Sequence, residues 1–126
     1  MNEKKDMSTN IFITKSFSFA VDVVNTYKFL SETKREYVLS KQFLRSGTAV
    51  GALIREAQNA ESKADFIHKL GIAQKECDES IYWLELLKET DYISEPTFED
   101  LKFKATELLK MIRSSIITIK QKQAQK

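Results

Sequence analysis

Glycine and proline are nearly absent from this sequence, which holds three Gly and one Pro in 126 residues. A sheet protein of this length needs many such residues in the turns between its strands, so their scarcity favours helices. The length suits one domain with one hydrophobic core, and 42% apolar with 30% charged residues is a globular composition. We therefore predict a single all-α domain.

Apolar residues recur at helical spacing in four long segments, which are separated by short polar breaks. Short connections force neighbouring helices to run in opposite directions, so we expect an antiparallel up-down-up-down four-helix bundle. The bundle is predicted over residues 10–122. The polar residues 1–9 and 123–126 are expected to be flexible ends.

Polar residues mark the boundaries of the later helices. The second helix is predicted over about residues 37–60. Ser62, three residues before Asp65, is expected to begin the third helix as an N-cap whose hydroxyl accepts an unpaired backbone N–H. Ser94 is expected to cap the fourth helix, whose first turn tolerates Pro96 because the missing N–H would be unpaired there anyway.

The first predicted helix carries apolar side chains on two flanks. The flank expected to face the core consists of Ile13, Phe17, Ala20, Val24 and Tyr27. The second flank consists of Phe12, Phe19, Val23 and Leu30. The resulting stripe is wider than a single core contact needs, so we expect something else to cover the second flank.

The third predicted helix has an apolar flank beside its inner stripe, formed by Ile72, Trp83 and Leu86. Large exposed apolar patches usually mark interfaces. Together with the second flank of the first helix, it predicts contact between protomers through Phe12, Phe19, Ile72, Trp83 and Leu86. The alternative is that Trp83 lies along a neighbouring helix of the same chain.

Two of the three glycines, Gly47 and Gly51, lie four residues apart in "LRSGTAVGALIREAQ", a segment that otherwise has a helical pattern. Glycine inside a helix costs about 0.5–1 kcal/mol relative to alanine. A phosphate-binding loop would need a preceding strand and a Gly-Lys-Ser/Thr ending. A membrane GxxxG motif would need an apolar stretch, which Arg45 and Arg55 interrupt. We therefore predict close helix packing at both glycines.

Groups that could support catalysis are sparse. His68, the only histidine, falls on a surface with Lys75 and Glu79, and the single Cys77 falls on the inner face as a small buried thiol. One His and one Cys cannot assemble a common zinc site. We expect a protein that is not an enzyme and has no catalytic residues, cofactor or metal. An enzyme that uses His68 or the carboxylates Glu76 and Glu79 is the remaining hypothesis.

The N-terminal "MNEKKDMSTN" has no apolar core typical of a signal peptide, and no later segment approaches eighteen uninterrupted apolar residues. Neither secretion nor membrane insertion is therefore expected. A lone Cys77 cannot form an internal disulfide, which agrees with a reducing compartment. We expect a cytoplasmic protein with no membrane partner.

Basic side chains gather on the outer side of the second and third predicted helices. The net charge is only +2, so nucleic-acid binding would have to come from a local patch. A closed ring of protomers would repeat such a patch around one axis and offer a multivalent surface to phosphates. The alternative is an ordinary solvated face. The predicted nucleic-acid-binding residues are Lys41, Arg45, Arg55, Lys69 and Lys75.

Three stretches, "LRSGTAVGA", "EAQNAESKADFIHKLGIAQKE" and "YWLELL", resemble the four-helix-bundle family of proteins encoded in intervening sequences of bacterial 23S rRNA genes. They are also similar to the accessory variability protein of diversity-generating retroelements. The resemblance implies homopentameric rings of antiparallel bundles and no catalytic residues. For the retroelement relative it implies a basic surface for nucleic acid and a reverse transcriptase. Leu53 departs from the family, whose members often have Asn there.

The leading hypothesis is a non-enzymatic, homo-oligomeric helical bundle, expected to be a pentamer. It would bind the backbone of RNA or DNA, or a nucleic-acid-processing protein such as a reverse transcriptase, through the basic surface. The alternative is a protein-interaction scaffold with no nucleic-acid role.

Overall fold

The computed structural model describes residues 3–124, with side chains from residue 11 onward, and this part of the chain forms four α-helices and no strand. The helices are α1 (Glu3–Glu32), α2 (Leu39–Gln58), α3 (Lys63–Glu89) and α4 (Glu95–Ala124). The all-α class with four helices is thereby confirmed. None of these helices is both long enough and apolar enough to cross a membrane.

The first helix begins earlier than the sequence predicted. α1 includes residues 3–9, which were expected to form a flexible end before the domain begins at residue 10. This segment lacks an apolar stripe, but Glu, Lys and Met are good helix formers, which favours the longer helix. α4 continues to Ala124, and the remaining predicted ends, residues 1–2 and 125–126, lie outside the described residues.

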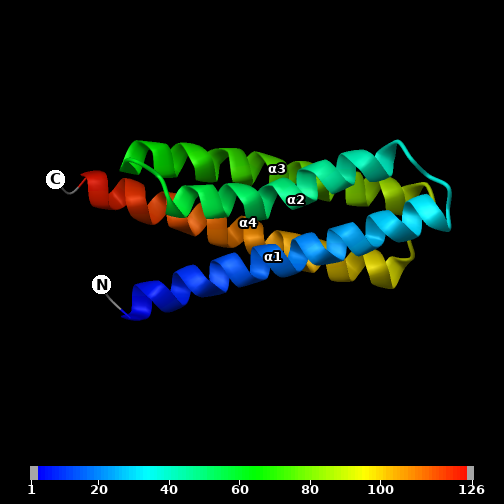
Figure 1. The fold of residues 1–126 in the computed structure, drawn as a ribbon, viewed down its shortest axis with the longest axis horizontal. Coiled ribbons are helices and arrows are strands. Elements are labelled where there is room, and N and C mark those ends of the chain that lie inside the picture. The colour runs from blue at the N-terminus through cyan, green and yellow to red at the C-terminus, as the bar shows by residue number, and fades with distance from the viewer. Residues whose placement is uncertain (1–2, 125–126) are drawn as a thin grey trace.

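The helices lie side by side along the long axis of the molecule, and the chain reverses at each short connection (Figure 1). The N-terminal end of α1 and the C-terminal end of α4 lie at the same end of the molecule (Figure 1). α2 packs against α1 and α3, and α3 packs against α4. The contact between α1 and α4 is much smaller, and α1 diverges from α4 toward its N-terminus (Figure 1). The α1–α4 seam is therefore the most open side of the fold.

The rotation of α1 about its axis differs from the one predicted, by about 100°. Phe12 and Phe19, predicted to contact another protomer, are only 6% and 1% exposed and lie in the chain's own core. Phe17, predicted to face the core, is 55% exposed. Both flanks are apolar, so periodicity alone could not choose between them. The core draws on all four helices, and its largest fully buried side chains include Phe19, Leu30, Phe43, Ile54, Leu70, Leu84, Leu108 and Ile112.

The shape of α2 explains this rotation. A Cβ atom added at Gly47 would lie 2.7 Å from a methyl carbon of Val23, and one added at Gly51 would lie 3.2 Å from the backbone oxygen of Ser16. Val23 and Ser16 are buried on α1, so the bare backbone of α2 lets this flank of α1 come close. The structure thus places both glycines at the α1–α2 contact.

Serine caps begin α3 and α4, as predicted. The Ser62 hydroxyl accepts a hydrogen bond from the Asp65 N–H at 3.0 Å, and the Ser94 hydroxyl accepts one from the Thr97 N–H at 3.3 Å. Pro96 lies in the first turn of α4. These bonds satisfy backbone donors that have no partner inside the helix.

The start of α2 depends on a glutamate that the sequence did not single out. The carboxylate of Glu36 accepts hydrogen bonds from the backbone N–H groups of Ser40, Leu39 and Val38 at 2.7, 3.1 and 3.1 Å. Burial alone raises the pKa of the Glu36 carboxyl, but the N–H donors outweigh it and hold the pKa below its usual value. An anion therefore sits at the positive end of the α2 dipole.

Candidate interaction surface on α2 and α3

The five predicted nucleic-acid-binding residues come from two neighbouring helices. Lys41, Arg45 and Arg55 lie on α2 and are exposed. Lys69 and Lys75 lie on α3, where Lys69 is half-buried and Lys75 is exposed. Since α2 and α3 share the largest contact in the molecule, these side chains belong to one broad surface, but their partners differ.

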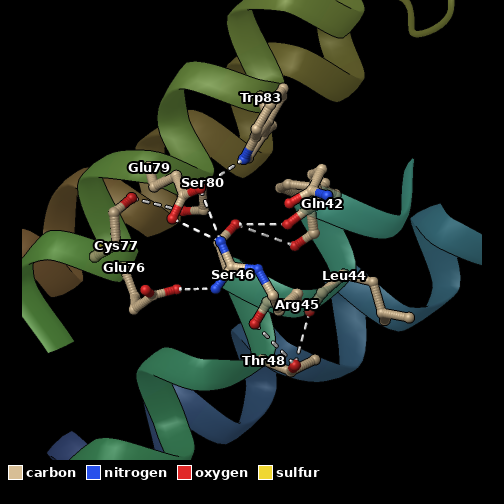
Figure 2. Close-up of polar contacts among 11 residues, drawn as sticks. Gln42, Leu44, Arg45, Ser46, Thr48, Glu76, Cys77, Glu79, Ser80 and Trp83 are labelled. Carbon is tan, nitrogen blue, oxygen red and sulfur yellow. Dashed lines mark hydrogen bonds and ion pairs between the residues drawn. The ribbon is translucent and has the colours of Figure 1, made fainter. Parts of the chain in front are cut away.

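Arg45 joins α2 to α3 through two carboxylates (Figure 2). Its Nη1 donates to Glu76 Oε2 at 2.8 Å, and its Nη2 donates to both carboxylate oxygens of Glu79 at 2.8 Å. The Glu79 hydrogen bond raises the pKa of the Arg45 guanidinium, and the Arg45 hydrogen bond lowers the pKa of the Glu79 carboxyl. One cation is thus shared by two anions, so this part of the surface carries no excess positive charge.

Trp83 continues the same cluster along α3. Its Nε1 donates to Glu79 Oε1 at 3.4 Å, and its ring packs partly buried against the core (Figure 2). Tyr82 meets it edge to face, with ring centroids 5.0 Å apart. Ile72 and Leu86 are half-buried on the same helix. The chain itself therefore covers part of the flank that was predicted to contact another protomer.

Two further cations of the predicted patch also have partners within the chain. Lys69 Nζ lies 3.4 Å from Glu56 Oε1. The Arg55 guanidinium lies over the ring of Phe17, 5.3 Å from its centroid. Within residues 11–124, only Lys41 and Lys75 of the five cations have no ion pair or ring contact. The structure does not bring the five residues together as one continuous basic patch.

Small polar side chains at the α2–α3 contact, of which Ser46 and Ser80 are buried, bond to the backbone (Figure 2). Ser46 donates to the Gln42 carbonyl at 3.0 Å, Thr48 to the Leu44 carbonyl at 2.7 Å, and Ser80 to the Cys77 carbonyl at 2.6 Å. These hydroxyl protons are therefore already engaged within their own helices. Such bonding to the preceding turn is ordinary for Ser and Thr inside helices.

The remaining candidate reactive groups lie apart. Cys77 is buried and its Sγ donates to the Ala105 carbonyl at 3.2 Å, while burial raises the pKa of its thiol to about 12. A thiol with so high a pKa stays protonated and unreactive near neutral pH. His68 is exposed on α3. Among the described residues, no group of three or more His, Cys, Asp or Glu is placed to hold a metal ion.

Most of the exposed apolar side chains were not predicted to be exposed from the sequence. Phe17 and Val21 lie one helical turn apart on α1, and Val38 at the start of α2 is 72% exposed. The sequence signal for the exposed residues of α1 was its two apolar flanks, but Phe17 was assigned to the core, and Phe12 and Phe19 were assigned to an interface. The large exposed apolar residues are Ile11, Phe17, Val21, Phe29, Tyr37, Val38, Tyr82, Phe103 and Ile117.

Comparison with known proteins identifies the family. The family model of the 23S rRNA-intervening sequence protein matches residues 8–114. The chain belongs to this family. No curated protein matches the chain. A crystal structure of a protein of unknown function from the S23 ribosomal protein family of Bacteroides thetaiotaomicron is 51% identical and superposes with a TM-score of 0.85. The match covers 86% of this chain and 97% of that one.

One departure from the 23S rRNA-intervening sequence proteins has a structural meaning here. Leu53, at the position where the resemblance implies Asn in relatives, is partly buried and packs against the hydrophobic core. This chain therefore uses apolar packing at that position of α2. The family match and the solved relative together account for the fold, and neither carries a stated activity.

Proposed function

We propose that this 23S rRNA-intervening sequence protein is a non-enzymatic, antiparallel up-down-up-down helical bundle that assembles with copies of itself in the cytoplasm. A pentameric ring is the assembly that the family resemblance implies. The observation that carries the proposal is the exposed apolar stripe of α1, formed by Phe17 and Val21. Contiguous exposed apolar surface usually marks an interaction site.

The stripe has a defined place on α1. Arg55 of α2 lies over Phe17, whereas Lys104 of α4 binds Asp22 at 2.7 Å. Phe17 therefore lies at the edge of α1 that faces α2, and Asp22 lies at the edge that faces α4. Val21, four residues after Phe17, continues the stripe along the same side. A helix from a second protomer could bury both side chains without disturbing the α1–α4 ion pairs.

Light scattering after size exclusion tests the assembly. We expect the wild-type chain at micromolar concentration to elute at a multiple of 14.6 kDa. Phe17→Glu should shift it toward the monomer, because a carboxylate replaces the apolar side chain of the stripe. The helical circular dichroism should stay unchanged, because the new carboxylate would lie beside Arg55. Tyr82→Glu is the matched control, since Tyr82 is also 55% exposed but lies on α3, which does not contact α1.

The outcomes separate clearly. A wild-type chain that is monomeric at these concentrations would contradict self-assembly. Equal loss of assembly in Phe17→Glu and Tyr82→Glu would contradict the assignment of the interface to α1. Assembly that survives Phe17→Glu alone would likewise move the interface elsewhere.

A second candidate function is binding to the phosphate backbone of RNA or DNA, or to a nucleic-acid-processing protein. The observation that favours it is the exposed pair Lys41 and Lys75, which have no ion pair within residues 11–124. In a closed assembly each cation would recur once per protomer, and the phosphate contacts would add. A scaffold that binds only proteins is the competing hypothesis.

Fluorescence anisotropy with labelled single-stranded RNA and duplex DNA tests this candidate. Affinity should fall steeply between about 50 and 200 mM salt, as phosphate contacts require. Lys41→Glu with Lys75→Glu should weaken binding and flatten the salt slope. The control is Lys110→Glu with Lys120→Glu, two exposed lysines of α4 that give the same change in net charge. No binding at low salt, or equal weakening by both pairs, would count against a nucleic-acid role.

A further inference from the structure

A pocket opens in the α1–α4 seam near the end of the molecule that is opposite both termini. Its volume is about 850 Å³, and it is lined by the second half of α1, Lys34 of the α1–α2 connection, the α3–α4 connection and the first turns of α4. α1 and α4 share the smallest contact of any adjacent helix pair, so the pocket lies on the side where the fold is least closed (Figure 1). Nothing in the α2–α3 surface involves it.

The floor of the pocket is apolar. Ile93 and Leu101 are buried beneath it, and Phe29, which is exposed, forms part of its wall. Tyr92 and Pro96 complete the lining beside them. An apolar side chain that entered this space would therefore lose water on several sides at once, which favours its binding.

Acidic groups stand around this floor. Asp22 and Asp100 share one cation, because Lys104 Nζ lies 2.7 Å from the first carboxylate and 3.1 Å from the second. Asp91 has no ion pair within residues 11–124. Lys34 lies over the Phe29 ring, 5.7 Å from its centroid. Three carboxylates against two lysines leave an excess of negative charge at the rim.

The chain carries a segment with the complementary character. In the α1–α2 connection, Val38 is 72% exposed and has the exposed Tyr37 beside it. The cations Arg35 and Lys41 flank these apolar side chains and are exposed. Neither cation makes an ion pair within residues 11–124. The connection thus presents apolar side chains between two cations, and the pocket presents an apolar floor with acidic groups around it. The two surfaces are therefore complementary in hydrophobicity and in charge.

The two surfaces also lie at the same end of the molecule. The α1–α2 connection and the α3–α4 connection are both at the end opposite the termini (Figure 1). A rotation about an axis parallel to the helices keeps this level unchanged. The connection of one copy can therefore meet the pocket of the next, in a head-to-tail contact that closes into a ring when the rotation allows.

We infer that the α1–α4 pocket binds the α1–α2 connection of a second copy of this chain, with Val38 against the apolar floor and Arg35 against the acidic rim. This inference rests on the proposed self-assembly and names its contact. The Phe17 and Val21 stripe lies near the middle of α1 and not beside this connection, so the two are separate parts of the donating copy's surface.

Disulfide trapping tests the contact. The variant Val38→Cys with Asn25→Cys places one thiol on the connection and one on an exposed lining residue of the pocket. The native Cys77 is buried and stays unreactive. Mild oxidation should convert the double variant into a reducible ladder of covalent multimers. Val38→Cys with Lys110→Cys, which puts the second thiol on an exposed site outside the pocket, is the control and should give no ladder.

A second variant tests the same contact without thiols. Val38→Asp puts an anion against the acidic rim and should weaken assembly by about tenfold or more in light scattering, whereas Val38→Ile should preserve it. A ladder no stronger than the control, together with assembly unaffected by Val38→Asp, overturns the pocket contact. If the wild-type chain still assembles in that case, the proposed self-assembly stands, and only the proposed location of the contact between copies is wrong. A monomeric wild-type chain overturns both.

Discussion

The three helical glycines differ in how much space surrounds them, and this space decides what an added side chain would do to stability. Gly51 lies against the backbone of α1 at Ser16, which cannot move aside like a flexible side chain. At Gly71, an added Cβ atom would have nothing within 4 Å. Adding a side chain should therefore have opposite effects at these two sites.

We predict that Gly51→Leu lowers the free energy of unfolding by about 1–3 kcal/mol or prevents folding, because overpacking forces α1 and α2 apart. Gly71→Ala should raise it by about 0.5–1 kcal/mol, since alanine favours the helix. Arg55→Glu on the outer side of α2 should leave the protein folded. Urea unfolding followed by circular dichroism measures all three. Equal stability of Gly51→Leu and the wild type would contradict the close packing of α1 on α2.

Glu36 gives a prediction with a defined pH dependence. The pKa of its carboxyl is lower in the folded protein than its ordinary value of 4.5. The folded state therefore binds this proton less tightly than the unfolded state, and the stabilisation is fully present above the unfolded pKa. It is lost as the pH falls through the folded pKa.

Glu36→Gln should lower the free energy of unfolding by about 1–2 kcal/mol at neutral pH, because an amide is uncharged and its NH2 group cannot accept the N–H bonds that the second carboxylate oxygen accepts. The difference from the wild type should shrink at a pH below the folded pKa. Glu32→Gln, an exposed residue at the end of α1, is the control. A difference that stays constant from pH 7 into the acid range would show that the charge of Glu36 is not what stabilises α2.

At the scale of the element, the four helices and two of their caps could be predicted because they depend on local patterns. Ser62 and Ser94 bond to the residue three positions ahead, so the sequence alone contains both partners. The rotation of α1 could not be predicted in this way. It depends on which flank fits the bare backbone of α2 at Gly47, and that is a contact between distant segments.

The partners of Arg45 were hidden for the same reason. Glu76 and Glu79 lie more than thirty residues after Arg45 and on another helix. The sequence alone therefore did not indicate that carboxylates neutralise this cation of α2. The basic residues were correctly placed on the outer side, but helix packing supplied the carboxylates that neutralise them. Only Lys41 and Lys75 keep the role that the sequence suggested, and that role stays a prediction.

The Arg45 contact predicts a measurable coupling between α2 and α3. In a double-mutant cycle of Arg45→Ala and Glu79→Gln, we expect a coupling energy of about 0.5–1 kcal/mol, as for a half-exposed, hydrogen-bonded ion pair. It should fall in about 1 M salt, where charges are screened within a few ångströms. Arg45→Ala with Glu85→Gln, an exposed glutamate of α3, is the control cycle and should show no coupling. A coupling of zero for Glu79 would make this ion pair irrelevant to stability.

At the scale of the whole molecule, the open α1–α4 seam and the exposed apolar side chains leave apolar surface that a second copy could bury. Two ion pairs join α1 to α4, Lys15 with Glu107 and Lys104 with Asp22. Exposed ion pairs contribute little to stability. A neighbouring copy that covers the stripe and the pocket would therefore add stability that the isolated chain lacks.

This link between assembly and folding predicts that thermal stability depends on protein concentration. If copies bind one another only when folded, mass action raises the unfolding temperature as concentration increases. We expect the midpoint of thermal unfolding for the wild type and for Tyr82→Glu to rise by several degrees from about 2 to about 200 µM. Phe17→Glu should unfold at a lower temperature that does not change over this range, because its folded form no longer gains from association. A wild-type midpoint that is independent of concentration would mean that α1 and α4 are stable without a neighbour, and the exposed stripe would then need another explanation.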